Sequence, residues 1–129
     1  MSKLGIEREI KGDYEDVVSR TIEALKTEGF GVLTRIDVKP TLKEKLNVDF
    51  TNYVILGSCN PPLAHQALTA TKEVGLLLPC NVIVYERAAG DIVVSAVNPE
   101  VMMSVLPDAG LDGVAATASE KLRSALSKI

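Results

Sequence analysis

Residues 81–97 read NVIVYERAAGDIVVSAV, two strongly apolar runs separated by the short link at 88–91. Valine, isoleucine and tyrosine are typical of strands, and a short link containing a glycine is typical of a hairpin. The stretch therefore predicts an antiparallel hairpin. Its apolar side chains alternate onto both sides, so each side needs a cover. We expect helices on one side and a second copy of the chain, in a homodimer, on the other.

N-terminal to this hairpin, the pattern predicts further strands over 3–10, 30–38 and 53–59. A helix from Tyr14 has apolar residues at three-to-four spacing, with Asp13 as its N-cap and Gly29 at its end. In the strand over 30–38, strict alternation puts positions 30, 32, 34 and 36 on one face and 31, 33, 35 and 37 on the other. Thr41 to Glu44 match a capping box, which predicts a short helix to about Leu46.

Asparagine followed by proline occurs twice, at 60–62 and 98–99, and this pair is typical of a helix start. We expect helices from Asn60, from Asn98 through Met103, and from about Asp112 to the end. No linker or repeat divides residues 1–129, so the chain is predicted to be one domain. The element order favours an α+β two-layer sandwich, a largely antiparallel sheet with helices on one face.

The composition argues against membrane-spanning, secreted and nucleic-acid-binding proteins. The 129 residues carry a net charge of −3, with 47% apolar and 24% charged residues, which is ordinary for a soluble globular domain. The apolar runs are too short for a membrane-spanning helix, and the charged start predicts no secretory signal, so we expect a cytoplasmic protein. Few aromatics and no basic run argue against nucleic-acid binding.

Three reactive side chains, Cys59, His65 and Cys80, could meet at one end of the sheet. Cys59 ends a strand directly before the N-cap Asn60, where free amides and the helix dipole would favour a thiolate and bind an anion. His65 lies in the helix that follows, and Cys80 and Asn81 open the next strand. If the two strands are neighbours, two thiols, two carboxamides and an imidazole gather there.

Each of these residues also has a purely structural interpretation. A buried cysteine packs as a small apolar side chain, a single histidine on a helix is commonly a surface group, and Asn60 is a helix cap. Cys59, His65 and Cys80 match no regular zinc spacing, which leaves a soft metal as the candidate ion. No motif for a nucleotide or another cofactor is present.

Four blocks, at 29–37, 55–61, 64–68 and 77–82, resemble the signature blocks of the prokaryotic family catalogued as domain of unknown function 302. The resemblance implies a curved antiparallel sheet under helices, similar to the TATA-box-binding-protein-like class, and often a dimer. It implies no activity. Cys59, His65 and Cys80 match the motif residues of the family, and Ser58 stands where alanine is expected.

These observations favour a dimeric module that binds a small ligand or soft metal through Cys59, Asn60, His65, Cys80 and Asn81. One alternative is a small thiol-dependent enzyme, in which Cys59 attacks an electrophile and His65 moves the proton. Another is a structural or interaction protein. The geometry of the two sulfurs and the imidazole discriminates between them.

Overall fold

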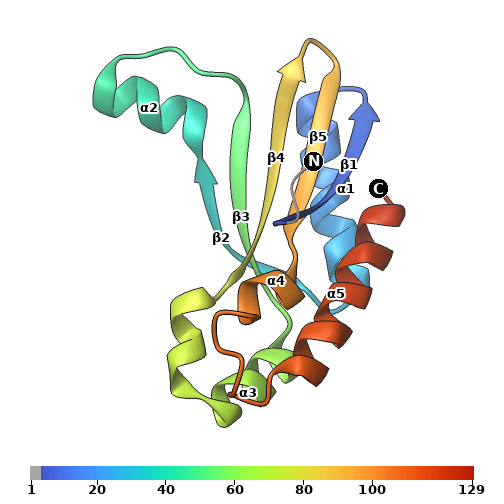
Figure 1. Cartoon of the computed structure of the whole chain (residues 1–129). Helices are drawn as coiled ribbons and strands as arrows, with labels where there is room; N and C mark the ends of the chain where they lie inside the picture. The colour runs from blue at the N-terminus through green and yellow to red at the C-terminus, as the bar shows by residue number, and fades with distance from the viewer. Residues whose placement is uncertain (1–3) are drawn as a thin grey trace.

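An antiparallel sheet carries long helices on one face (Figure 1). The computed structural model describes residues 4–129, so the first residue of the strand predicted over 3–10 lies outside the described residues. The strands follow the order β1-β5-β4-β3-β2, with bounds β1 (Gly5–Lys11), β2 (Gly31–Asp37), β3 (Tyr53–Cys59), β4 (Cys80–Ala88) and β5 (Asp91–Val97). The helices are α1 (Tyr14–Thr27), α2 (Val38–Leu46), α3 (Pro61–Ala70), α4 (Pro99–Met103) and α5 (Asp112–Ser127), with a 3₁₀ helix η1 (Lys72–Leu77). The predicted α+β two-layer class is confirmed.

The predicted hairpin is formed by β4 and β5, with Val84 opposite Val94. Gly90 has a φ of 74°, a left-handed conformation that glycine adopts without strain, and its amide donates to the Glu86 carboxylate at 3.0 Å. β1 pairs with the other side of β5, and β3 pairs with the other side of β4. The hairpin is therefore the centre of the sheet.

The main core lies between the sheet and the helices α1 and α5. Alternate side chains of the strands point towards these helices and pack against the apolar face of α1. This face is therefore buried, as its three-to-four spacing predicts. Asp13 caps α1 by accepting from the Asp16 amide at 3.0 Å. The largest fully buried side chains of this core are Phe30, Leu25, Leu56, Ile92 and Leu122.

Strict alternation in β2 is wrong, because a β-bulge lies between Val32 and Thr34. Val32 pairs with Ser58, whereas Thr34 pairs with Gly57, so the two residues lie on opposite faces. Arg35 shares the helix-covered face with Asp37, and the two side chains form an ion pair at 3.2 Å.

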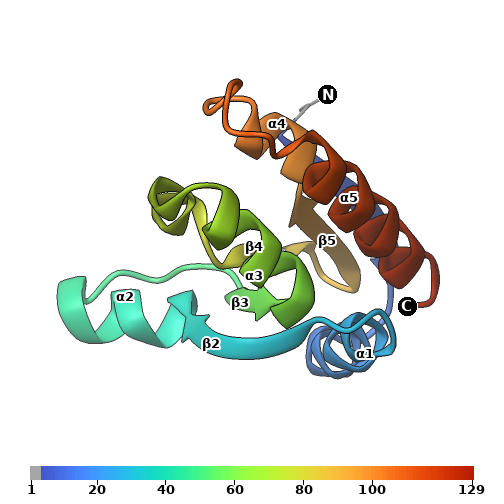
Figure 2. The ribbon, with the colours of Figure 1, turned by 90° about the horizontal axis from the view of Figure 1, so that it is seen from below.

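The predicted capping box at Thr41 is also wrong, because α2 begins three residues earlier, at Val38. The Thr41 hydroxyl instead donates to the Asp37 carbonyl at 2.7 Å, inside the first turns of the helix. The predicted end at Leu46 is confirmed, and Asn47 follows with a φ of 54°. α2 buries no residue and projects beyond β2, apart from α1 and α5 (Figure 2).

A second, smaller core lies beyond one end of the sheet. α3, η1, α4 and the start of α5 meet there, and both predicted Asn-Pro helix starts are confirmed. Asn98 accepts from the Glu100 amide at 3.0 Å. The buried side chains of this second core are Ala67, Val74, Met103, Leu111 and Ala115. It positions α3 across the end of the sheet.

Candidate functional site

A pocket of about 330 Å³ lies between the two cores, where β3 ends and β4 begins. Figure 2 shows α3 lying across this end of the sheet. The lining is almost entirely carbon and sulfur, and it includes no charged side chain. The residues that line the pocket are Phe30, Leu33, Thr34, Ser58, Cys59, Asn60, Leu63, Ala64, Ala67, Leu68, Leu78, Pro79, Cys80, Met103, Val114 and Ala118.

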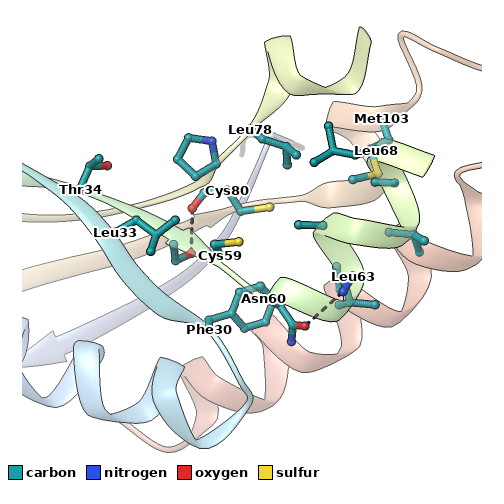
Figure 3. A pocket seen from close by; sticks show the side chains of 16 residues that line it. Phe30, Leu33, Thr34, Cys59, Asn60, Leu63, Leu68, Leu78, Cys80 and Met103 are labelled. Carbon is teal, nitrogen blue, oxygen red and sulfur yellow. Dashed lines mark hydrogen bonds between the residues drawn. The ribbon is translucent and has the colours of Figure 1, made fainter. Parts of the chain in front are cut away.

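The sulfurs of Cys59 and Cys80 point into the same space (Figure 3). β3 and β4 are neighbours, and Ser58 lies directly opposite Cys80. The Ser58 hydroxyl donates to the Cys80 carbonyl at 2.8 Å, which holds the two strand ends together. Both cysteines are free thiols. The predicted meeting of two thiols at one end of the sheet is therefore what the structure has.

The two thiols differ in exposure. Cys59 is partly exposed, and Cys80 is buried. Burial raises the pKa of the Cys80 thiol to about 11, and the neighbouring Cys59 sulfur contributes in the same direction. At neutral pH Cys80 is thus an uncharged thiol, which suits an apolar pocket and does not suit a nucleophile.

Asn60 lines the pocket, but its side chain already has its hydrogen-bond partners. Its carbonyl oxygen accepts from the Leu63 amide at 3.4 Å, as the predicted N-cap of α3. Its amide nitrogen donates to the Glu28 carbonyl at 3.1 Å. Asn60 therefore ties α3 to the end of α1 and has a structural role at the pocket wall.

The prediction of an anion site at the start of α3 is wrong. The first two residues of the helix, Pro61 and Pro62, have no amide hydrogen. The next two amides, of Leu63 and Ala64, donate to the side chain and the carbonyl of Asn60. A helix start whose amides are absent or already bonded offers an anion no donor.

The structure does not bring His65 or Asn81 into the pocket. Both side chains are exposed, and neither belongs to the pocket lining. Across residues 4–129, His, Cys, Asp and Glu side chains form no group of three or more that could hold a metal ion. The two sulfurs and the imidazole of the predicted trio therefore do not meet at one site.

Sequence reasoning missed most of the pocket wall. Met103 comes from α4, and Val114 and Ala118 come from α5, more than thirty residues beyond Cys80. Leu63 and Leu68 of α3 also line the pocket, where Leu63 is half-buried and Leu68 is 36% exposed. The apolar spacing along α3 could have indicated these residues. The same spacing, however, is typical both of side chains that pack in a core and of side chains that line a pocket.

The fold and the pocket together define a class: α+β domains with an open antiparallel sheet and an apolar pocket at one end of it. The model of the family described as domain of unknown function DUF302 matches residues 6–129, and the chain belongs to this family. The chain is also similar to the crystal structure of an uncharacterized conserved DUF302 protein from Bacillus stearothermophilus. The two are 31% identical, with 98% of each chain covered and a TM-score of 0.89.

No curated protein matches the chain. Within residues 4–129, the helices are all too short or too polar to cross a bilayer.

Proposed function

We propose that this chain is a cytoplasmic, dimeric binding module whose pocket takes a small apolar molecule. The observation that carries this proposal is the pocket of about 330 Å³, lined by hydrocarbon with two thiols at one end. Small-molecule sites typically have volumes of roughly 300 to 1,000 Å³ and apolar walls. The thiol-enzyme alternative is not favoured, because His65 is exposed and lies outside the pocket lining.

The position of the pocket also supports binding. A packed interior rarely leaves a void of this size, since each lost contact costs stability. Here two separate cores meet the end of one sheet, and the space between them stays open to solvent beside Leu33, which is 68% exposed. Burying an apolar ligand there contributes roughly 25 cal/mol for each Å² of apolar surface removed from water.

A neutral, polarity-sensitive naphthalene dye tests the pocket. We expect its fluorescence to rise and to saturate at one dye per chain. Ala64→Leu extends a side chain from α3 into the pocket and is expected to weaken binding of the dye at least about tenfold, because the added carbons occupy the space of the ligand. Ala70→Leu, on the exposed end of the same helix and outside the pocket lining, is the matched control. Equal binding by both variants contradicts the proposal.

The second copy is proposed to cover the sheet face that α1 and α5 leave open. This face carries Ile36, Ile55 and Ile83, together with the stacked rings of Tyr53 and Tyr85, whose centroids are 5.4 Å apart. Ile36 is 49% exposed. An apolar face of this kind is typical of an interface between subunits.

The segment from α2 to β3 supports the same proposal. α2 has no buried residue, and a nine-residue helix has little stability of its own in water. Leu46, the last residue of α2, is 66% exposed, and the segment that follows exposes Val48 by 42% and Phe50 by 44%. A partner that packs against this segment would bury these side chains and hold the helix.

Charge complementarity selects a second copy as that partner. α2 carries Lys39, Lys43 and Lys45 against one acidic residue, Glu44. The opposite edge of the sheet, β1, carries Glu7, Glu9 and Lys11 on its open face. Glu9 pairs with Arg87 at 3.0 Å and Lys11 pairs with Asp91 at 3.3 Å, so Glu7 is the carboxylate available to a lysine of the second copy. A two-fold, face-to-face dimer places α2 of one copy against β1 of the other, so that unlike charges meet twice.

Sedimentation velocity at micromolar concentration tests this dimer. We expect a dimer for the wild type, and weaker association for Lys45→Glu and for Glu7→Lys. The double variant, with both changes in one chain, is expected to recover the dimer, because each contact again joins unlike charges. Glu120→Lys, on the exposed face of α5, is the control. A wild type that sediments only as a monomer contradicts the proposal.

A further inference from the structure

The pocket lining contains two thiols, and few of its other polar groups are free to bond a ligand. Asn60 uses both ends of its side chain for hydrogen bonds, and the Ser58 hydroxyl is bonded to the Cys80 carbonyl. The start of α3 offers no free amide. Beside the Thr34 hydroxyl, which also lines the pocket, Cys59 and Cys80 are therefore the groups that can recognise the ligand by chemistry as well as by shape (Figure 3).

Resting on the proposed function, we propose that the pocket takes an apolar molecule with an uncharged thiophilic centre, which bonds to the sulfurs of Cys59 and Cys80 together. Monosubstituted trivalent arsenicals are the simplest compounds of this class. Their apolar substituent would occupy the hydrocarbon part of the pocket, between Leu68 and Met103 on one side and Phe30 on the other.

The absence of charge in the lining disfavours a monovalent soft metal as the thiophilic ligand. A monovalent soft metal held by two thiolates forms an anionic centre, and the pocket lining has no cation to compensate it. A trivalent arsenical forms two covalent bonds to sulfur and stays neutral. Counted over the whole reaction, each cysteine enters as an uncharged thiol, which is the state of the buried Cys80 at neutral pH.

The reaction balances without an oxidant or a reductant. The hydrated arsenical carries two hydroxyl groups on arsenic. Each thiol replaces one of them, so that one arsenic–oxygen bond breaks and one arsenic–sulfur bond forms. The thiol proton leaves with the hydroxyl group as water. Arsenic remains trivalent, each sulfur keeps its oxidation state, and two water molecules are released.

Phenylarsine oxide is the probe, with intact-mass measurement and thiol counting as readouts. We expect one arsenical per chain, loss of both free thiols, and displacement of the naphthalene dye. Cys59→Ser and Cys80→Ser are each expected to weaken binding of the arsenical at least about a hundredfold. The reason is that the second sulfur bonds to an arsenic already held by the first, at a high effective concentration. The pentavalent anion phenylarsonate, with the same ring, is the matched control and is expected not to bind.

The outcomes separate this inference from the proposed function. If the dye binds but the arsenical leaves one thiol free, or the single-cysteine variants bind it as well as the wild type, the inference is overturned and the apolar pocket stands. If neither dye nor arsenical binds, both proposals fall. Bridging that is equally strong in urea-unfolded protein also overturns the inference, because the folded pocket then contributes nothing.

Discussion

The hydroxyl of Ser58 donates a hydrogen bond to the carbonyl of Cys80 at 2.8 Å, across the last paired residues of β3 and β4. Ser58 is fully buried, so this bond is shielded from water. It fixes the end of one strand to the start of the next. Cys59 and Cys80 are consequently held at the same pocket wall, although twenty residues separate them in the chain.

Removing that bond is expected to cost stability. Ser58→Ala leaves the Cys80 carbonyl without the hydroxyl partner, and a lost buried hydrogen bond costs about 1 kcal/mol of unfolding free energy. Urea denaturation measures the change. Ser104→Ala is the control, because the Ser104 hydroxyl bonds the Val101 carbonyl on the exposed surface of α4. Equal midpoints for both variants contradict the role of Ser58.

The Cys80 thiol is expected to react slowly at neutral pH. Its pKa is raised to about 11, by burial first and by Cys59 second, so little thiolate is present near pH 7. In a Cys59→Ser variant, where Cys80 is the remaining cysteine, the pKa is expected to fall below that of the wild type but to stay above its ordinary value of 9.0, because the burial remains. The pH profile of alkylation by iodoacetamide measures it. A profile identical to that of the urea-unfolded chain contradicts the burial argument.

Gly57 is expected to tolerate no side chain. A Cβ at this position would overlap the Thr34 hydroxyl and lie 2.9 Å from Pro79 Cγ. Gly57→Ala therefore forces β2 and the chain before β4 apart, at a cost of about 1 to 3 kcal/mol. Thermal unfolding of Gly57→Ala and of Gly57→Ala with Thr34→Ala measures the effect, and the double variant should recover part of it. Gly113→Ala, where a Cβ meets nothing within 4 Å, is the control.

Asp91 is expected to make stability depend on pH in the acid range. Arg87 holds the pKa of this carboxyl below its ordinary value, and Lys11 contributes less. The folded state thus binds a proton less readily than the unfolded state. The contribution of Asp91 is complete above the unfolded pKa of about 4 and is lost as pH falls through the folded pKa.

The Asp91→Asn variant tests this dependence. Urea midpoints measured from pH 6 to about pH 2 should fall less steeply for the variant than for the wild type. Asp108→Asn, an exposed position in the turn before α5, should leave the slope unchanged. If the urea midpoint depends on pH equally in Asp91→Asn and the wild type, the ion pair with Arg87 does not contribute to the pH dependence of stability.

The secondary structure followed from local signals, and the exceptions have local physical reasons. The caps at Asp13, Asn60 and Asn98 were predictable because a cap depends on the few residues around it. The bulge after Val32 was not predictable, because it depends on how β2 pairs with β3, whose residues paired at the bulge lie more than twenty positions further along the chain. The start of α2 was misplaced because Thr41 can serve equally as a cap or as a hydroxyl bonded inside a helix.

The sequence by itself determined the α+β class and the hairpin of β4 and β5, because strand pattern follows from local periodicity. It placed Cys59 near Cys80 only on the condition that β3 and β4 are neighbours, which the tertiary structure decided. Only the tertiary structure decided that His65 faces solvent and that Met103 and Ala118 complete the pocket. The reason is that a pocket is the space left between elements distant in sequence. Its walls are set by how α3, α4 and α5 pack, which no local pattern encodes.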